Sequence, residues 1–185
     1  ITYKVWAYNG QGESLNDVND RKSFGARGTV TVAPKLDVGA SWFAHDGIVT
    51  SDGVADSSAT NQAFDLDAQY GKPGDQGLFA LMEYLQGTDA TPAGARMRGF
   101  QVLAAYNVKP AGLPAWLSGI EPSVRLDLAD PDTDAPDDRV TTLTAGFGLY
   151  FTSRAWFRLA YERQDLQAAG AESVGGIRSM LAVSF

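Results

Sequence analysis

The last ten residues of the chain, GIRSMLAVSF (176–185), decide the fold. Alternate residues of this stretch share one face of a period-two strand that ends on an aromatic residue: Ile177, Ser179, Leu181, Val183 and Phe185. In transmembrane β-barrels, lipid-facing and lumen-facing side chains alternate along each strand, and aromatic residues gather at both membrane interfaces. The segment therefore predicts the closing strand of an outer-membrane β-barrel, with Phe185 in the girdle on the periplasmic side.

The same alternation recurs along the whole chain. Phe157 and Leu159 face one way, for example, while Arg158 between them faces the other. Phe79 and Leu81 are the exceptions, as apolar residues expected on a polar face. The pattern predicts an all-β fold, an antiparallel transmembrane β-barrel with about ten strands in this chain. These strands are expected over residues 2–9, 26–32, 36–42, 64–70, 78–84, 100–107, 123–128, 142–151, 156–162 and 177–185.

The connections between these strands alternate in length, as in barrels that have short periplasmic turns and longer outer loops. The short turns are 33–35, 72–75 and 152–154, and the long polar stretches are 11–20, 49–62, 87–95, 130–138 and 168–175. This order places the carboxyl terminus on the short-turn side. Lys109–Gly119 is the exception, because it is long on that side. Its Pro114–Ser118 segment allows a turn of helix, and we expect Leu113, Trp116 and Leu117 to contact the barrel rim.

Composition limits the classes of function. The 185 residues suit a single domain, 1–185, and the formal net charge of -7 argues against a nucleic-acid partner. The chain has no cysteine, which excludes disulfides, iron-sulfur centres and thiolate zinc sites. No run of about 18 apolar residues occurs, so no transmembrane helix is predicted. The sequence begins directly in a strand pattern, which we interpret as a mature or truncated chain.

A secreted β-sandwich is the main alternative fold, because its strands also alternate and recur every 8–12 residues or so. Two features favour the barrel. The apolar face carries aromatic residues near the strand ends, such as Phe64 and Tyr70 or Phe100 and Tyr106, as a girdled band would. The opposite face holds glycine, threonine and charges of both signs, which suits a water-filled interior.

The assigned faces predict that twelve charged residues line the lumen: Lys4, Arg27, Asp37, Asp65, Asp67, Glu83, Glu121, Arg125, Asp127, Arg158, Glu162 and Arg178. These five positive and seven negative charges form a mixed wall. Such a wall favours no ion strongly, because selectivity needs rings or ladders of one sign. Arg125 and Asp127 lie two residues apart on one strand, and Arg158 and Glu162 lie four apart on another. We therefore expect ion pairs between strands.

Two long stretches carry a series of motifs. Residues 2–43 combine Tyr8-Asn9-Gly10, the Asn/Asp-rich segment Asn16–Asp20, Arg27, Pro34 and Gly39. Residues 120–167 combine Arg125-x-Asp127, an acidic loop, Gly146, Gly148 and Tyr161-Glu162-Arg163. In this order the motifs resemble those of the phosphate-selective porin O and P family, and together the two stretches cover most of the chain.

The resemblance implies a 16-stranded barrel that assembles as a homotrimer in the bacterial outer membrane. This chain then supplies the C-terminal part of one barrel, unless it is a smaller relative that closes with ten strands. The phosphate specificity of that family depends on an arginine ladder and a lysine cluster. Neither is visible in this sequence, so we do not extend phosphate selectivity to it.

A calcium site is the first alternative chemistry. Hard cations bind several carboxylate oxygens, and the chain offers five neighbouring acidic residues: Asp130, Asp132, Asp134, Asp137 and Asp138. However, the glycine that lets a calcium loop turn sharply is absent, and Pro131 and Pro136 stiffen the segment. These features favour a solvated extracellular loop, with loose divalent bridging to lipopolysaccharide phosphates as a further role.

A protease is the second alternative, because some ten-stranded outer-membrane barrels activate water with Asp and His at the outer rim. His45-Asp46 lies at the outer end of a strand, and Asp65-x-Asp67 lies on the next. A general base needs an orienting partner within hydrogen-bond reach. In the expected register Asp65 and Asp67 run down into the lumen, away from that rim, which favours a polar rim role for His45.

The function we predict is an outer-membrane porin for passive diffusion of small hydrophilic solutes or ions, anions among them. We predict no enzymatic step, cofactor or metal, and we expect outer-membrane lipid and lipopolysaccharide as partners. A non-conducting structural or adhesive barrel is a further alternative. Small inward-facing residues such as Gly39, Ser41 and Gly146 suit a wide barrel. We therefore expect more strands before Ile1, with residues 2–9 pairing with one of them and not with the closing strand.

Substitutions in the closing strand test the assigned faces. Leu181 and Val183 are predicted to face lipid, and Arg178 and Ser184 to face the other way. A charge at mid-bilayer on the lipid face costs about 2 to 4 kcal/mol. Leu181→Arg should therefore block assembly, whereas Arg178→Leu should not. Refolding into lipid vesicles, followed by heat-modifiable migration on gels, measures assembly. Equal tolerance of both substitutions would mean a register wrong by one residue.

Overall fold

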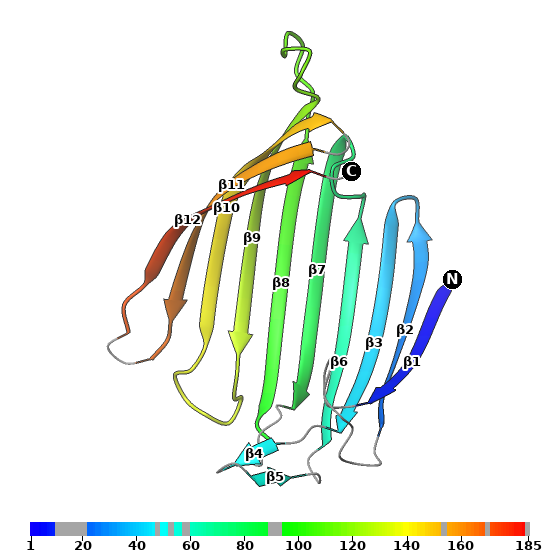
Figure 1. Ribbon diagram of the computed structural model, residues 1–185, viewed down its shortest axis with the longest axis vertical. Helices are drawn as coiled ribbons and strands as arrows, with labels where there is room; N and C mark the ends of the chain where they lie inside the picture. The colour runs from blue at the N-terminus through cyan, green and yellow to red at the C-terminus, as the bar shows by residue number, and fades with distance from the viewer. Residues whose placement is uncertain are drawn as a thin grey trace.

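The computed structural model describes residues 1–9, 22–46, 49–51, 54–56, 60–88, 94–152, 155–168 and 171–183 (Figure 1). Ten long strands form one antiparallel sheet in chain order, which confirms the predicted all-β class. They are β1 (Thr2–Asn9), β2 (Lys22–Ala33), β3 (Leu36–Asp46), β6 (Thr60–Tyr70), β7 (Gly77–Thr88), β8 (Arg96–Asn107), β9 (Gly119–Asp130), β10 (Val140–Thr152), β11 (Ala155–Leu166) and β12 (Val174–Val183).

Two connections differ from the expectations. β4 (Val49–Ser51) and β5 (Val54–Asp56) pair as a small separate sheet within a stretch expected to be a loop. At Pro114–Ser118 the N–H of Leu117 donates to the carbonyl of Pro114 (2.9 Å), which closes a single turn and not a helix. Leu117 is buried there, as expected, whereas Trp116 stays largely exposed beside the ring of Phe151. No helix among the described residues is long and apolar enough to cross a membrane.

The strand register keeps two chemically different faces apart across the whole sheet. Asp67 lies opposite Gly39 on one side and Glu83 on the other, whereas its neighbour Leu66 lies opposite Ala40. Paired residues point to the same face of a sheet, and successive residues point to opposite faces. Most polar and apolar positions therefore stay separate from β1 to β12, although Leu81, Leu85 and Leu103 lie on the polar face. The faces assigned from the sequence agree with this register, including Phe79 on the polar face.

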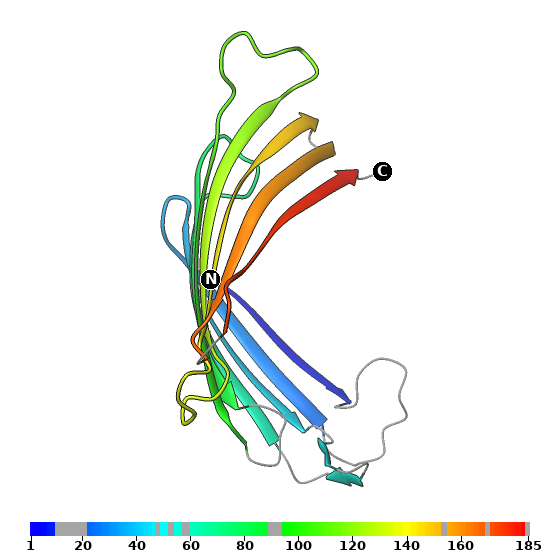
Figure 2. The ribbon, with the colours of Figure 1, turned by 90° about the vertical axis from the view of Figure 1, so that its left-hand side faces the viewer.

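The sheet is a curved wall (Figure 2). Contacts of the turn between β6 and β7 identify its polar face as the concave one. The turn between β6 and β7 bends toward the concave side, where it contacts polar-face residues. The N–H of Gly74 donates to Glu121 (3.3 Å), and the side chain of Asn107 donates to the Gly74 carbonyl (2.9 Å). Side chains converge on a concave face and spread apart on a convex one. Accordingly Glu121 is 4% exposed, whereas Leu66 on the convex face is 45% exposed.

β1 and β12 are the two edges of this sheet, which does not close on itself. Their side chains are the most open, with Val5 75% and Ile177 76% exposed. Across the described residues β1 pairs only with β2, and β12 only with β11, which agrees with the expectation that the first and closing strands do not pair. Further strands before Ile1 stay a prediction. Ser184 and Phe185, and so the predicted aromatic girdle position, lie outside the described residues.

Two glycines of β10 should respond differently to a methyl group. A Cβ at Gly146 would lie 2.7 Å from Cα of Ala160 on β11, whereas a Cβ at Gly148 would meet its nearest atom at 3.6 Å. Overpacking costs typically about 1 to 3 kcal/mol. We expect Gly146→Ala to lower the urea midpoint of the refolded protein and Gly148→Ala to leave it nearly unchanged. The reverse order would contradict the register between β10 and β11.

Candidate functional site: the concave polar face

The twelve charged residues predicted to line a lumen share the concave face of the sheet. Their common side follows from the pairings, which link these residues from β1 through to β12 without a change of parity. In the described part of the sheet, the register shifts only at the strand ends, between Thr31 and Ala33 and between Tyr150 and Thr152. Lys4 lies on β1 opposite Arg27, and Asp37 accepts a hydrogen bond from Thr31 (2.5 Å). Most of the others form four ion-paired groups, with nearest N···O distances of 3.4 Å or less.

The largest of these groups surrounds Arg27 in the middle of β2. Its guanidinium contacts both carboxylate oxygens of Asp67 (2.8 and 3.0 Å), donates to Ser41 (2.8 Å) and lies 3.5 Å from Asp65. Two-oxygen contact of this kind is the strong, oriented form of an ion pair. A Cβ at Gly39 would lie 2.7 Å from the guanidinium, so glycine at this point of β3 leaves room for the pair.

Glu83 extends this cluster onto β7, where it lies opposite Asp67. We call Arg27, Asp65, Asp67 and Glu83 the acidic group. One positive and three negative charges leave it a formal surplus of two negative charges. The side chains of Asp65 and Asp67 are only 16% and 12% exposed. Water and salt therefore screen their mutual repulsion less than they would at an open surface.

The other arginines of the concave face are each paired with one carboxylate: Arg125 with Asp127 (2.7 Å), Arg158 with Glu121 (3.4 Å) and Arg178 with Glu162. The expectation of ion pairs between strands is confirmed for the last two. Arg125 instead pairs within its own strand, and Arg158 does not pair with Glu162 on its own strand. Arg158 reaches Glu121 across β10 because Gly148, which lies between them in the register, has no side chain.

Sequence reasoning missed an aromatic row at the long-loop end of this face. The rings of Tyr8, Phe43 and His45 lie nearly parallel, with centroids 5.8 to 6.3 Å apart. Nδ1 of His45 is 2.9 Å from the hydroxyl oxygen of Ser23, which is fully buried. The signal in the sequence is Phe43 two residues before His45, at inward positions of a strand whose other inward residues are Asp37, Gly39 and Ser41.

The arrangement expected for a protease is not assembled at His45. Asp65 lies opposite Ser41, four residues along β3 from His45 and therefore about 13 Å away at the rise of a strand. The hydrogen-bond partner of His45 is the buried Ser23, whose hydroxyl is closed to a substrate. The side chain of Asp46 lies outside what the structure describes.

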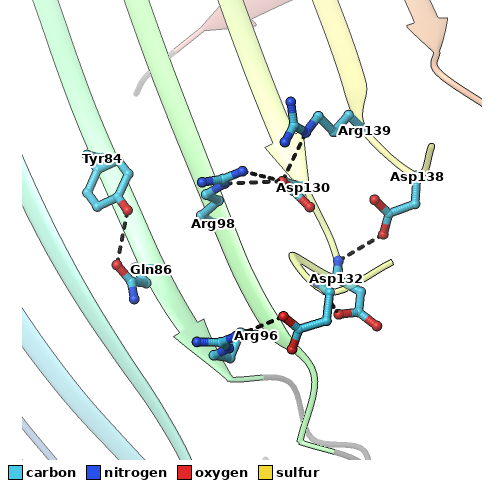
Figure 3. A network of polar contacts seen from close by, with 9 residues as sticks. Tyr84, Gln86, Arg96, Arg98, Asp130, Asp132, Asp138 and Arg139 are labelled. Carbon is cyan, nitrogen blue, oxygen red and sulfur yellow. Dashed lines mark hydrogen bonds and ion pairs between the residues drawn. The ribbon is translucent and has the colours of Figure 1, made fainter. Parts of the chain in front are cut away.

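The acidic loop after β9 is held by arginines (Figure 3). One carboxylate oxygen of Asp130 accepts hydrogen bonds from Arg98 (2.9 and 3.1 Å) and Arg139 (3.1 Å), and Asp134 pairs with Arg96 (2.8 Å). Asp130 is only 6% exposed. The expectation of a solvated loop is therefore wrong at this residue, where two guanidinium groups replace water around the carboxylate.

The carboxylates of this loop are not grouped around a metal position, and the loop does not lie on the concave face. Asp138 accepts a hydrogen bond from the backbone N–H of Asp132 (2.9 Å). Within the part of the chain that the structure describes, no three His, Asp or Glu side chains are placed to hold a metal ion. A groove of about 510 Å³ beside the loop is lined by convex-face residues such as Tyr84, Phe100 and Leu128, so it lies on the other side of the sheet from the acidic group.

No protein family matches the chain, and no curated protein matches it either. Function must therefore be inferred from the sheet, its two faces and their charges.

Removal of Arg27 should destabilise the protein more than removal of Arg125. Losing one partner of a buried ion pair costs roughly 3 to 5 kcal/mol. The 34% exposure of Arg27 reduces the expected cost of Arg27→Met to about 2 kcal/mol. Arg125 is 46% exposed and has a single partner, so Arg125→Met should cost under about 1 kcal/mol.

The urea concentration at half-unfolding, measured after refolding into lipid vesicles, gives the loss of stability in each of the two variants. Combining Arg27→Met with Asp67→Asn should restore part of the stability, because the second change removes one of the unpaired charges. Equal losses in the two single variants would contradict the special position of Arg27.

Proposed function

We propose that this chain forms part of the wall of an outer-membrane porin, through which small hydrophilic solutes or ions diffuse passively. The observation that carries the proposal is the sidedness of the curved sheet. Large apolar side chains such as Leu66, Met82, Leu126 and Phe147 are exposed on its convex face. Water-soluble sheets cover such a face with a second layer, and the residues that the structure describes supply none.

A bilayer is the solvent that suits this convex face. Phe64 and Tyr70 are both exposed there, six residues apart on β6, with Leu66 and Ala68 between them. At about 3.3 Å per residue the two rings lie about 20 Å apart along the strand. Barrel strands are tilted by about 40°, so the two rings lie about 15 Å apart along the membrane normal, which fits within the apolar band of about 25 Å in outer-membrane barrels.

Closure into a barrel is part of the proposal. Backbone groups facing hydrocarbon must be hydrogen-bonded, so the free edges of β1 and β12 need further strands beside them. The resemblance of the sequence motifs to the phosphate-selective porin O and P family is the ground for proposing a 16-stranded barrel and a homotrimer. In this arrangement the convex face contacts lipid and the long loops contact lipopolysaccharide.

The proposed channel prefers cations to anions. Outside the acidic group, the arginines of the concave face are matched one to one with carboxylates. The charges of Lys4, opposite Arg27, and Asp37 cancel formally. The net surplus of two negative charges on the face therefore equals that of the acidic group, with its carboxylates at Asp65, Asp67 and Glu83. Fixed charge of one sign raises the local concentration of counter-ions, and salt screens this effect. Cation preference should therefore be strongest in dilute electrolyte.

Planar-bilayer recording of the full-length protein, with the strands that complete the barrel, under a salt gradient tests the proposal. We expect stepwise openings with a reversal potential on the cation-selective side. Replacing the acidic-group carboxylates (Asp65→Asn, Asp67→Asn, Glu83→Gln) should move this potential toward the anion side. Asp134→Asn on the exposed loop is the control and should not change it. A bilayer that stays sealed at high protein load would favour a structural or adhesive barrel.

A further inference from the structure

The connection between β6 and β7 is folded onto the concave face and does not simply cap the end of the sheet (Figure 2). Gly74 in this turn is hydrogen-bonded to Asn107 on β8 and to Glu121 on β9. A Cβ on Gly74 would lie 3.4 Å from the ring of Tyr150 on β10. The turn therefore contacts side chains of three successive strands beyond β7, namely β8, β9 and β10.

Glycines allow this unusual path. Gly71, Gly74 and Gly77 have φ angles of +75°, +81° and +102°. Other residues rarely adopt this left-handed region, because their Cβ atoms clash with the backbone. The N–H of Gly71 also donates to the carbonyl of Lys35 (2.8 Å), which ties the turn to the neighbouring short turn. The path is thus fixed at both its beginning and its middle.

Glu121 on β9 anchors the folded turn to the concave face of the sheet. It accepts hydrogen bonds from the N–H of Gly74 (3.3 Å) and the hydroxyl of Tyr150 (3.0 Å), and it pairs with Arg158 (3.4 Å). A buried carboxylate is costly unless donors and an opposite charge surround it. The backbone of the turn is one of the groups that meet this need, so the turn and Glu121 stabilise each other.

We propose that residues 71–76 form a constriction at the short-turn end of the lumen and that Glu121 holds it in position. The inference rests on the proposed porin function. The turn occupies space above the concave face that a permeating solute would otherwise cross. Lys72 and Asp75 are exposed on it and bring one charge of each sign into that space. The turn at residues 71–76, and not only the wall of strands, should therefore limit the size of the solutes that pass.

Two carboxylates on and after β9 provide a comparison. Glu121→Gln removes the charge that holds the turn, whereas Asp134→Asn removes an exposed charge on the loop after β9 that pairs with Arg96. We expect single-channel conductance to rise by about twofold in Glu121→Gln, as for a pore whose narrow part widens. Asp134→Asn should leave the conductance near the wild-type value. Unchanged conductance in both variants would contradict the anchoring role of Glu121.

Thiol labelling tests the position of the turn without disturbing Glu121. The chain has no cysteine, so Asp75→Cys introduces a unique thiol in the folded turn, and Lys35→Cys introduces one in the neighbouring short turn. A bulky thiol reagent should reduce the current through Asp75→Cys and have little effect on Lys35→Cys. No effect at residue 75 in conducting channels would overturn the constriction. Absence of conductance in the wild-type protein would instead overturn the porin function.

Discussion

Backbone hydrogen bonding fixes which way each side chain faces, because a slip of one residue turns a whole strand over. On β6 such a slip would place Asp65 and Asp67 on the apolar convex face and bring Leu66 among the ion pairs. The contacts of Arg27 with Ser41 and Asp67 join β2, β3 and β6 across the concave face and oppose this slip. The charges of the concave face therefore help to fix the strand register, independently of the proposed role in solute passage.

Curvature gives the two faces different packing requirements. Side chains on the concave face converge, so glycine or another small residue must alternate with long charged ones. Gly39 leaves space for the contact between Arg27 and Asp67, and Gly148 leaves space between Glu121 and Arg158. The small residues of the polar face are therefore explained locally by ion pairing. This explanation is independent of barrel width, so these residues alone do not establish a wide pore.

The strands and their faces were predictable because each depends only on the two-residue period of the local sequence. Which charges meet was less predictable, since it depends on register between strands that are distant in sequence. Arg158 was expected near Glu162 but contacts Glu121, 37 residues away. The folded turn was not predicted at all. Its glycines suggested a tight turn, but its direction depends on Glu121 and Asn107, which lie far along the chain.

Two kinds of carboxylate occur on the concave face, one buried and one partly buried. Glu121 is surrounded by an arginine, a tyrosine hydroxyl and a backbone N–H, so its charge is compensated and its effect is structural. Asp65 and Asp67 share a single arginine with Glu83, so part of their charge remains uncompensated. An uncompensated charge costs stability but projects a field into the space above the sheet. The acidic group is therefore the part of this wall where charge costs stability and, under the proposed porin function, the part that most affects passing ions.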